Sequence, residues 1–306
     1  MIYFRMMDII KEIKKLKKEK KAIIMAHNYQ RKEVQEIADY LGDSLELARQ
    51  ATKVKAEIIV FAGVYFMAET AKILNPERVV LIPEEEATCA MAKMVDIVEL
   101  KKLKKQYPDA AVVSYINTTA ETKTYTDIVC TSANAVKIVN SLPNKRIIFL
   151  PDKNLGEFVS LKTDKEIILY PGFCYVHQQL ITEKMILDMK EKYKDSFIMV
   201  HSETPQSVQK HADAILSTGQ MIKEIGKIKT DNIIVGTEEG MVYRLRRDFP
   251  DKNFIPISMD AKCVGMKVIT LESIYNSLKF ERYKIEIDNK TVEKAKKPIL
   301  KMLDIK

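Results

Sequence analysis

The sequence predicts an α/β protein built from three similar αβα sandwich units, each with a parallel sheet covered by helices. Three cysteines, Cys89, Cys174 and Cys263, lie 85 and 89 residues apart, and each follows a short apolar run that ends at or near a proline. Within each interval, apolar runs of strand type alternate with helix patterns, which is typical of parallel sheets with both faces covered. If the units face a common axis in a pseudo-threefold arrangement, the three thiols meet there.

The first strand of each unit ends in polar residues. The strand patterns cover residues 22–26, 111–114 and 197–200. They lead into His27, Tyr115 and His201, which are 88 and 86 residues apart. Ligands of parallel sheets bind at the carboxyl ends of the strands. We therefore expect these strand ends to surround one central active site.

A hydroxyl residue recurs at a helix start in each unit. Ser44, Ser132 and Thr218 repeat the spacing of 88 and 86 residues, and each directly precedes a helical pattern, where an N-cap belongs. Helix starts also present backbone N–H groups and a positive dipole end to a phosphate or a carboxylate. Capping alone explains any one of them, but three helix ends aimed at one cavity suit substrates with several negative charges. A later strand and the cysteine loop complete each unit.

The repeat divides the chain into four predicted segments. They are 1–106 with an N-terminal helix and the first αβα repeat, 107–193 with the second repeat, 194–281 with the third repeat, and 282–306 as a C-terminal helical extension. Amphipathic patterns at 8–21 and 289–303 predict two charged helices that pack outside the threefold core.

Composition argues against several classes of protein. Hydrophobic residues make up 46% of the chain, but no apolar run approaches the roughly 20 residues that span a bilayer, so we expect no membrane partner. The lysine-rich start lacks the apolar stretch of a secretion signal, and four cysteines fit a reducing compartment, so we expect a cytoplasmic protein. The net charge of +8 comes from lysines spread among glutamates, which favours a solvated surface and no nucleic-acid partner.

Three thiolates that meet at one axis can hold a metal. With a fourth ligand they suit zinc, and alone they suit a [4Fe-4S] cluster with one iron left open. Spacing does not decide between these sites, although structural zinc usually takes cysteines in close pairs, which favours the cluster. Three packing cysteines are the remaining interpretation, and their equivalent placement argues against it. Cys130 lies in the middle of the second unit, so we interpret it as a packing residue.

Acid–base candidates come in pairs at the strand ends. The pairs are His27 with Tyr29, Tyr115 with Asn117, and His201 with Glu203. Residues two apart on a strand project to the same side of the sheet. A single such histidine or tyrosine is more often structural than catalytic, but three pairs at equivalent positions indicate a shared site.

Three further polar residues lie near the same edge. Glu238 and Asp152 end equivalent later strands in the third and second units, and we expect them to point inward or to cap the next helix. His177 follows Cys174 by three residues, and we place it behind the cysteine ligands.

Ordered motifs along nearly the whole chain resemble those of the quinolinate synthase family. They are AHNYQ at 26–30, GDS at 42–44, FMAETAK at 66–72, YINT at 115–118, CTSANA at 130–135, PDKNLG at 151–156, HSE at 201–203, STG at 217–219 and GTE at 236–238. The resemblance implies three αβα domains about a pseudo-threefold axis. It also implies a [4Fe-4S] cluster held by Cys89, Cys174 and Cys263, with one iron that has no protein ligand.

The resemblance further implies a reaction of NAD biosynthesis. Iminoaspartate and dihydroxyacetone phosphate condense to quinolinate, phosphate and water, a transferase-class step in which the open iron acts as a Lewis acid. The pathway implies a functional link to an aspartate oxidase or dehydrogenase that supplies iminoaspartate.

The same resemblance assigns roles to residues of the strand ends and helix starts. Glu203 is the leading general base, and Tyr29, Tyr115 and His201 complete the catalytic set. The implied substrate-binding residues are His27, Ser44, Asn117, Ser132, His201, Glu203, Ser217 and Thr218. We expect the helix ends, His27, His201 and the iron to neutralise two carboxylates and one phosphate in a closed pocket.

Two alternatives stay open at this point. One is another hydro-lyase that uses a three-cysteine cluster on a different hydroxy acid. The other is a cluster-bearing redox or iron sensor that binds nucleic acid, which would need a basic helix with exposed base-reading residues. We identify no such helix in the sequence.

Overall fold

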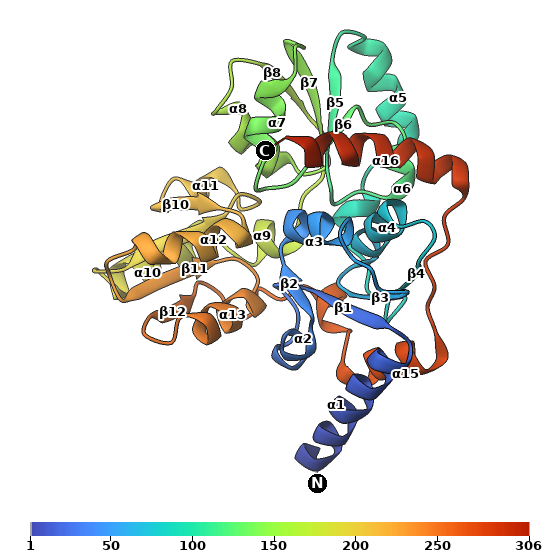
Figure 1. The fold of residues 1–306 in the computed structure, drawn as a ribbon. Coiled ribbons are helices and arrows are strands. Elements are labelled where there is room, and N and C mark those ends of the chain that lie inside the picture. The colour runs from blue at the N-terminus through green and yellow to red at the C-terminus, as the bar shows by residue number, and fades with distance from the viewer. Residues whose placement is uncertain (1, 306) are drawn as a thin grey trace.

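Three four-stranded parallel sheets form the framework of the chain (Figure 1). The computed structural model describes residues 2–305. The first sheet contains β1 (Ala22–His27), β2 (Tyr40–Gly42), β3 (Ile58–Ala62) and β4 (Val79–Leu81). The second contains β5 (Ala111–Tyr115), β6 (Ile128–Cys130), β7 (Arg146–Leu150) and β8 (Glu166–Leu169). The third contains β9 (Phe197–His201), β10 (Ala214–Leu216), β11 (Asn232–Gly236) and β12 (Asn253–Pro256). The predicted α/β class, with three similar parallel sheet units, is confirmed.

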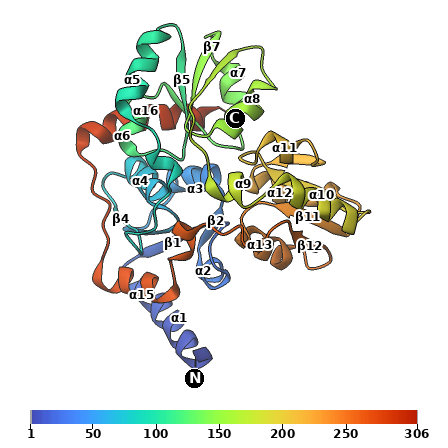
Figure 2. The same cartoon turned by 180° about the vertical axis from the view of Figure 1, so that it is seen from behind.

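The three sheets share one strand order. The orders are β2-β1-β3-β4, β6-β5-β7-β8 and β10-β9-β11-β12. The strand that opens each unit therefore lies inside its sheet, and His27, Tyr115 and His201 are the last residues of these inner strands. From the front and from behind, the sheets form three lobes around a common centre (Figures 1 and 2).

An aspartate ties the second strand to the first in every unit. The side chains of Asp39, Asp127 and Asp213 accept the N–H groups of Ile24, Val112 and Ile198 at 2.7, 2.8 and 2.8 Å. The N–H groups of the same aspartates donate to the carbonyls of the same partners at 2.9, 3.0 and 2.9 Å. These aspartates are again 88 and 86 residues apart. The three units therefore share these hydrogen bonds between the first and second strands, at the same spacing as the sequence repeat.

Helices connect the strands and cover the sheets. Those between or before the strands of the first sheet are α1 (Ile2–Glu19), α2 (Lys32–Ile37), α3 (Ser44–Ala51) and α4 (Tyr65–Leu74). Those of the second sheet are α5 (Ile97–Gln106), α6 (Ala120–Lys123), α7 (Ala135–Ser141) and α8 (Lys153–Ser160). Those of the third are α10 (Glu183–Lys192), α11 (Gln206–Gln209), α12 (Thr218–Glu224), the 3₁₀ helix η2 (Ile225–Lys227) and α13 (Gly240–Asp248).

A short helix follows each of the three spaced cysteines. These are the 3₁₀ helix η1 (Met91–Lys93), α9 (Tyr175–Gln179) and α14 (Val264–Lys267). The chain ends with α15 (Leu271–Phe280) and α16 (Asn289–Asp304).

The two C-terminal helices pack on sheets other than the nearest one in the sequence. Helix α15 packs against α1 and β3, and α16 lies across β6, α6 and α4 (Figure 1). The C-terminal helix thus joins the first and second units, and one buried cluster runs through both. The predicted domain boundaries stay a prediction.

The helix starts differ from the prediction. The N-caps are Asp43, Asn134 and Ser217, whereas Ser44 and Thr218 are the first helical residues and Ser132 lies in the turn before α7. The Asp43 side chain accepts the N–H groups of Leu45 and Glu46 at 3.0 and 2.9 Å, and it forms a capping box with Glu46. A carboxylate is the stronger acceptor, so it takes the cap and leaves the adjacent hydroxyl free.

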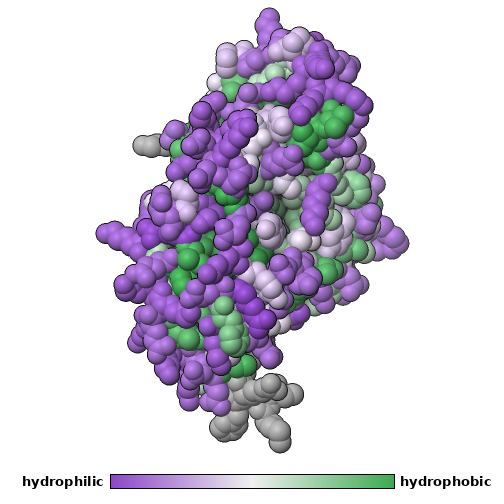
Figure 3. Space-filling view, turned by 90° about the vertical axis from the view of Figure 1, so that its right-hand side faces the viewer, coloured by the Kyte–Doolittle hydropathy of each residue, from purple (hydrophilic) through white to green (hydrophobic). Residues whose placement is uncertain are grey.

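None of the helices within residues 2–305 is long and apolar enough to cross a membrane. The face drawn in Figure 3 is mostly hydrophilic, with small and separate apolar patches. This agrees with lysines and glutamates that are spread along the chain as a solvated surface.

Candidate active site

One cavity lies where the three units meet. It is narrow, with about 60 Å³ of room for the centres of water-sized groups. Its polar lining residues are His27, Tyr29, Asp43, Ser44, Cys89, Tyr115, Asn117, Thr131, Ser132, Cys174, His177, His201, Glu203, Thr218, Glu238 and Cys263. Every site residue named from the sequence lines this cavity except Ser217.

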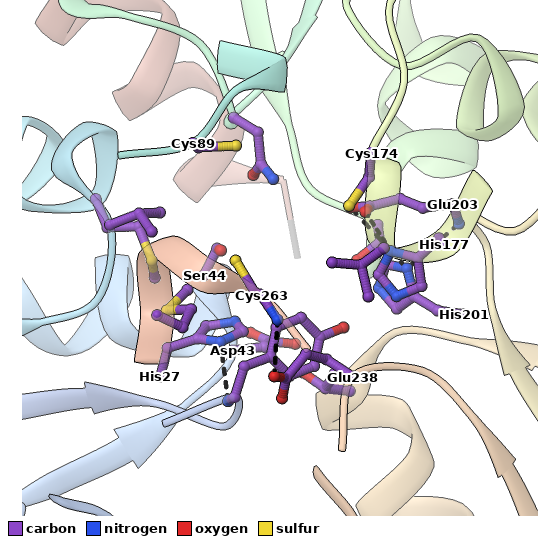
Figure 4. A pocket seen from close by; sticks show the side chains of 18 of the residues that line it. His27, Asp43, Ser44, Cys89, Cys174, His177, His201, Glu203, Glu238 and Cys263 are labelled. Carbon is purple, nitrogen blue, oxygen red and sulfur yellow. Dashed lines mark hydrogen bonds and ion pairs between the residues drawn. The ribbon is translucent and has the colours of Figure 1, made fainter. Parts of the chain in front are cut away.

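The three spaced cysteines reach the cavity from the three units. Cys89 comes from the loop after β4, Cys174 from the loop after β8, and Cys263 from the loop after β12. Their sulfur atoms point into the same space (Figure 4). Cys130 instead ends β6, is fully buried in the apolar core and does not line the cavity. It therefore packs as the sequence suggests.

Each cavity thiol faces backbone N–H groups of the helix that follows it. The donors are Met91 and Ala92 for Cys89, His177 for Cys174, and Gly265 and Met266 for Cys263. Burial nevertheless raises the pKa of Cys89 to about 12 and that of Cys263 to about 11, and it raises the pKa of Cys174 well above its ordinary value. Three converging thiols with N–H groups aimed at sulfur fit an iron–sulfur cluster, whose irons would bind them as thiolates.

Two buried carboxylates hold the cysteine loops from behind. Asp152 accepts the N–H of Cys174 at 3.2 Å, and Glu238 accepts the N–H of Cys263 at 3.0 Å. Asp152 also caps α8, and Glu238 also accepts the N–H of Gly240 at 2.7 Å. Glu238 thus points inward as one prediction has it, whereas Asp152 caps α8 and does not line the cavity. Such partners fix the position of metal ligands.

The cysteine loops also contact one another. The hydroxyl of Tyr175, next to Cys174, donates to the carbonyl of Lys262 at 3.1 Å and accepts the N–H of Val264 at 2.7 Å. These residues flank Cys263. A Cβ at Gly265 would lie 2.1 Å from the carbonyl oxygen of Thr88, next to Cys89, so only glycine permits this approach.

The strand-end histidines are neutral donors. Nδ1 of His27 accepts the N–H of Tyr29 at 3.2 Å, and Nδ1 of His201 accepts the N–H of Glu203 at 3.3 Å. Each ring therefore carries its proton on Nε2. Burial lowers the pKa of His27 to about 3 and that of His201 to about 4. Without a bound anion both rings are neutral and offer N–H groups, and their part in neutralising substrate charge stays a prediction.

Glu203 lies at the centre of a hydrogen-bonded network. Its Oε1 accepts a short hydrogen bond from the Tyr115 hydroxyl, and its Oε2 lies 2.8 Å from Nδ1 of His177. Nε2 of His177 lies 2.9 Å from the Thr237 hydroxyl, which lies 2.6 Å from the Tyr29 hydroxyl. The network thus joins both candidate tyrosines through Glu203.

The environment of this network sets its protonation. Burial alone would raise the pKa of Glu203, but His177, His201 and the hydrogen bonds from His177 and Tyr115 hold it below its usual range. Burial and the charge of Glu203 raise the pKa of Tyr29 and of Tyr115 well above 10. At neutral pH the carboxyl group is ionised and both tyrosines hold their protons.

A second metal arrangement is also within reach. Cys174, His177 and Glu203 each offer a ligand atom, and these atoms lie within 4.8 Å of one another, close enough to bind one metal ion. Nε2 of His177 lies 2.9 Å from the Thr237 hydroxyl, whereas Nδ1 lies 2.8 Å from Glu203 without a hydrogen bond of good geometry. This set contains only one of the three cysteines, so it does not use the thiols that converge from three equivalent units.

Comparison with known proteins agrees with this geometry. A family model described as quinolinate synthetase A protein matches residues 11–304. Quinolinate synthase from Pyrococcus abyssi is 52% identical over 301 residues, which are 98% of this chain and 100% of that protein. The chain belongs to the quinolinate synthase family. The resemblance drawn from the motifs is confirmed.

Other quinolinate synthases match over the same extent. Quinolinate synthase 2 from Methanosarcina acetivorans is 50% identical over 297 residues, which are 97% of this chain and 96% of that protein. Quinolinate synthase from Dehalococcoides mccartyi is 48% identical over 294 residues, which are 96% of this chain and 97% of that protein.

Ser217 takes a different position from the one that the family resemblance implies. Its hydroxyl caps α12 by accepting the N–H of Gln220 at 3.2 Å, and it donates to Asp43 at 3.4 Å. The neighbouring Thr218 lines the cavity, and its hydroxyl accepts from Asn28 at 2.9 Å. Of these two residues, only Thr218 lines the cavity of this quinolinate synthase family member.

Sequence reasoning missed or undervalued four residues of the site. Thr237 and Asp43 stand inside named motifs but were given no function, and Tyr175 was not considered. His177 was placed behind the ligands, whereas it lines the cavity and contacts Glu203. Its position three residues after Cys174, at the first turn of a short helix, is the signal that points to it.

The buried histidines predict that folding stability falls in acid. The folded-state pKa values of His27 and His201 lie below the ordinary 6.5, so the unfolded chain binds more protons once the pH falls below about that value. Their contribution is complete above pH 6.5 and is lost as the pH falls towards 4. We expect a loss of about 2 kcal/mol for each histidine between about pH 7.5 and about pH 5.

This loss is measurable by urea unfolding of the metal-free protein. His27→Gln and His201→Gln should each flatten the pH dependence of the unfolding free energy relative to the unsubstituted protein. An unchanged pH slope in these two variants would contradict the neutral assignment.

Proposed function

We propose that this chain is a quinolinate synthase of NAD biosynthesis. It condenses iminoaspartate with dihydroxyacetone phosphate to quinolinate, releasing phosphate and water, and it uses a [4Fe-4S] cluster held by Cys89, Cys174 and Cys263. The observation that carries the proposal is that one thiol from each of three units lines the same cavity as Glu203 in a member of this family. When bound, the cluster supplies a Lewis-acidic iron without a protein ligand.

Substrate carboxylates and phosphate need donors in this cavity. The Nε2–H groups of His27 and His201 and the hydroxyls of Ser44, Ser132 and Thr218 supply them. A bound carboxylate would raise the pKa of a nearby histidine, since an opposite charge favours the protonated ring. A histidine that is neutral in the empty cavity can therefore become protonated when an anion binds beside it. Asn117 adds an amide to the same wall and is a substrate-binding residue in this proposal.

Proton transfer is assigned to the network around Glu203. Tyr115 holds a proton that its hydroxyl already shares with the carboxylate, and Tyr29 holds a second one at the far end, beyond Thr237. Because Glu203 is ionised at neutral pH, it can accept a proton that the substrate or the network delivers, and its low pKa lets it release that proton again. His177 orients the carboxylate from the opposite side to Tyr115.

The apolar part of the lining limits access of water. Val64, Phe66, Met67, Val176 and Met266 line the cavity between the polar groups. An imine hydrolyses readily in water, and a dry wall protects it until condensation is complete. Four free cysteines and an oxygen-sensitive cluster fit a reducing cytoplasm.

Anaerobic purification and assay test this proposal. We expect a brown protein with about four irons and four sulfides per chain. With iminoaspartate generated in place by an aspartate dehydrogenase and NAD⁺ as its oxidant, and with dihydroxyacetone phosphate supplied, quinolinate should accumulate together with phosphate. The same preparation after removal of iron by a chelator should form none.

The outcomes separate the alternatives. A colourless protein with stoichiometric zinc would refute the cluster. An intact cluster without quinolinate, but with turnover of a hydroxy acid, would make the chain a different hydro-lyase. Salt-sensitive binding of DNA without turnover would favour an iron–sulfur sensor.

A further inference from the structure

A buried nitrogen binds the loop that follows the first strand in every unit. Nε2 of Gln35 donates to the carbonyls of Asn28 and Gln30 at 3.1 and 2.8 Å. Nε2 of Gln209 donates to the carbonyls of Ser202 and Thr204 at 3.0 and 2.6 Å. The second unit has a lysine in this place. Nζ of Lys123 donates to the carbonyl of Ile116 at 2.9 Å and also to the carbonyl of Thr118.

These three nitrogens occupy equivalent positions. Gln35, Lys123 and Gln209 are 88 and 86 residues apart, the same interval as His27, Tyr115 and His201. They lie in α2, α6 and α11, the helices that follow β1, β5 and β9 (Figure 1). In each unit the two bound carbonyls stand on either side of one residue. These central residues are Tyr29, Asn117 and Glu203, and all three line the cavity.

Long polar side chains are rarely buried without a specific partner. Gln35, Lys123 and Gln209 are only 2%, 0% and 4% exposed. Each side chain donates hydrogen bonds to the two loop carbonyls, and Gln35 also donates to the carbonyl of Gly240 at 3.0 Å. The bonds therefore fix the loop backbone on both sides of a residue whose side chain enters the active site.

We propose that Gln35, Lys123 and Gln209 are positioning residues, which hold Tyr29, Asn117 and Glu203 in the geometry needed for the reaction. The inference rests on the proposed function, since it concerns the same cavity. None of the three touches the cavity, so each acts through the backbone of the residue that it brackets.

The lysine of the second unit needs a counter-charge that the glutamines do not. Glu69 of α4, which is mostly buried, supplies it and also accepts the N–H of Ala120 at 3.1 Å. Burial lowers the pKa of Lys123 to about 8, and Glu69 opposes that shift. Because glutamine does the same task in the other units, Lys123→Gln combined with Glu69→Gln should retain the loop and the activity.

The test compares apolar and conservative replacements of similar length. Gln209→Met should lower kcat for quinolinate formation by roughly 10²-fold, as a displacement of about 1 Å would, with little change in KM. Lys123→Met should chiefly raise KM for dihydroxyacetone phosphate, because it releases Asn117, a proposed substrate-binding residue. The Lys123→Gln and Glu69→Gln double variant should recover the KM of the unsubstituted protein.

A lysine elsewhere provides the matched control. Nζ of Lys165 donates to the carbonyls of Leu142 and Asn144 at 2.5 and 2.6 Å, and neither these residues nor Lys165 lines the cavity. Lys165→Met should leave kcat and KM unchanged. Iron content and thermal unfolding are measured for every variant, because a loss of folded protein alone would lower kcat without altering KM.

The possible outcomes are distinct. Normal kcat in Gln209→Met together with normal KM in Lys123→Met would overturn the inference. A double variant with the same raised KM as Lys123→Met would also overturn it, because a glutamine at position 123 would then fail to hold the loop as the glutamines of the other units do. A failure of the proposed function itself would appear earlier, as unsubstituted protein that forms no quinolinate.

Discussion

Glu203→Gln is expected to lower the rate of quinolinate formation by about 10²- to 10⁴-fold while the iron content stays unchanged. Glutamine keeps the size of the side chain and can still accept the hydrogen bond from Tyr115. It removes the charge that Nδ1 of His177 faces at 2.8 Å, and with it the site that accepts protons from the network. The rate is measured anaerobically and is normalised to the cluster content.

A surface pair offers the control for this substitution. Oε1 of Glu183 lies 2.9 Å from Nε2 of His211, a glutamate–histidine contact outside the cavity. Glu183→Gln should leave turnover intact. Turnover of Glu203→Gln at the rate of the unsubstituted protein would remove Glu203 from proton transfer, whatever the identity of the cofactor.

Replacing any one of Cys89, Cys174 and Cys263 by alanine is expected to abolish both the cluster and turnover. Each thiol is the contribution of one unit, and no other cysteine lines the cavity within the part of the chain that the structure describes. Two ligands from the protein leave a second iron open, which weakens the cluster strongly. Iron and sulfide per chain, measured after anaerobic reconstitution, report the result independently of activity.

Cys130→Ala is the matched control for the cysteine series. Cys130 is fully buried, and burial raises the pKa of its thiol. We expect normal iron content and turnover, with a loss of about 1 kcal/mol in stability from the removed sulfur. Loss of the cluster in this variant would show that the ligand set is wrong.

Much of the site was predictable because the chain repeats one unit three times. Residues two apart on a strand share a side, and parallel strands end at one edge. His27, Tyr115 and His201 could therefore be placed together before the fold was known. The regular spacing also indicated that the three cysteines belong to one site, although each of them alone would be interpreted as a packing residue.

Local capping was not predictable from the same spacing. Asp43 precedes Ser44 and Ser217 precedes Thr218, so two adjacent side chains compete for each helix start. Asp43 takes the first cap and Ser217 the other, and a periodic pattern does not show which of two adjacent polar residues does so. This competition decides which residue lines the cavity, and for that reason Ser217 and Thr218 differ.

The sequence by itself determined the α/β class, the threefold repeat and the residues of the strand ends and cysteine loops. These follow from periodicity and spacing, which are local properties of the chain. Only the tertiary structure decided that His27 and His201 are neutral, that His177 and Thr237 connect Glu203 with Tyr29, and that Lys123 corresponds to two glutamines. Burial, pKa and long-range hydrogen bonds depend on what the other units place nearby, and no single segment of the sequence records that.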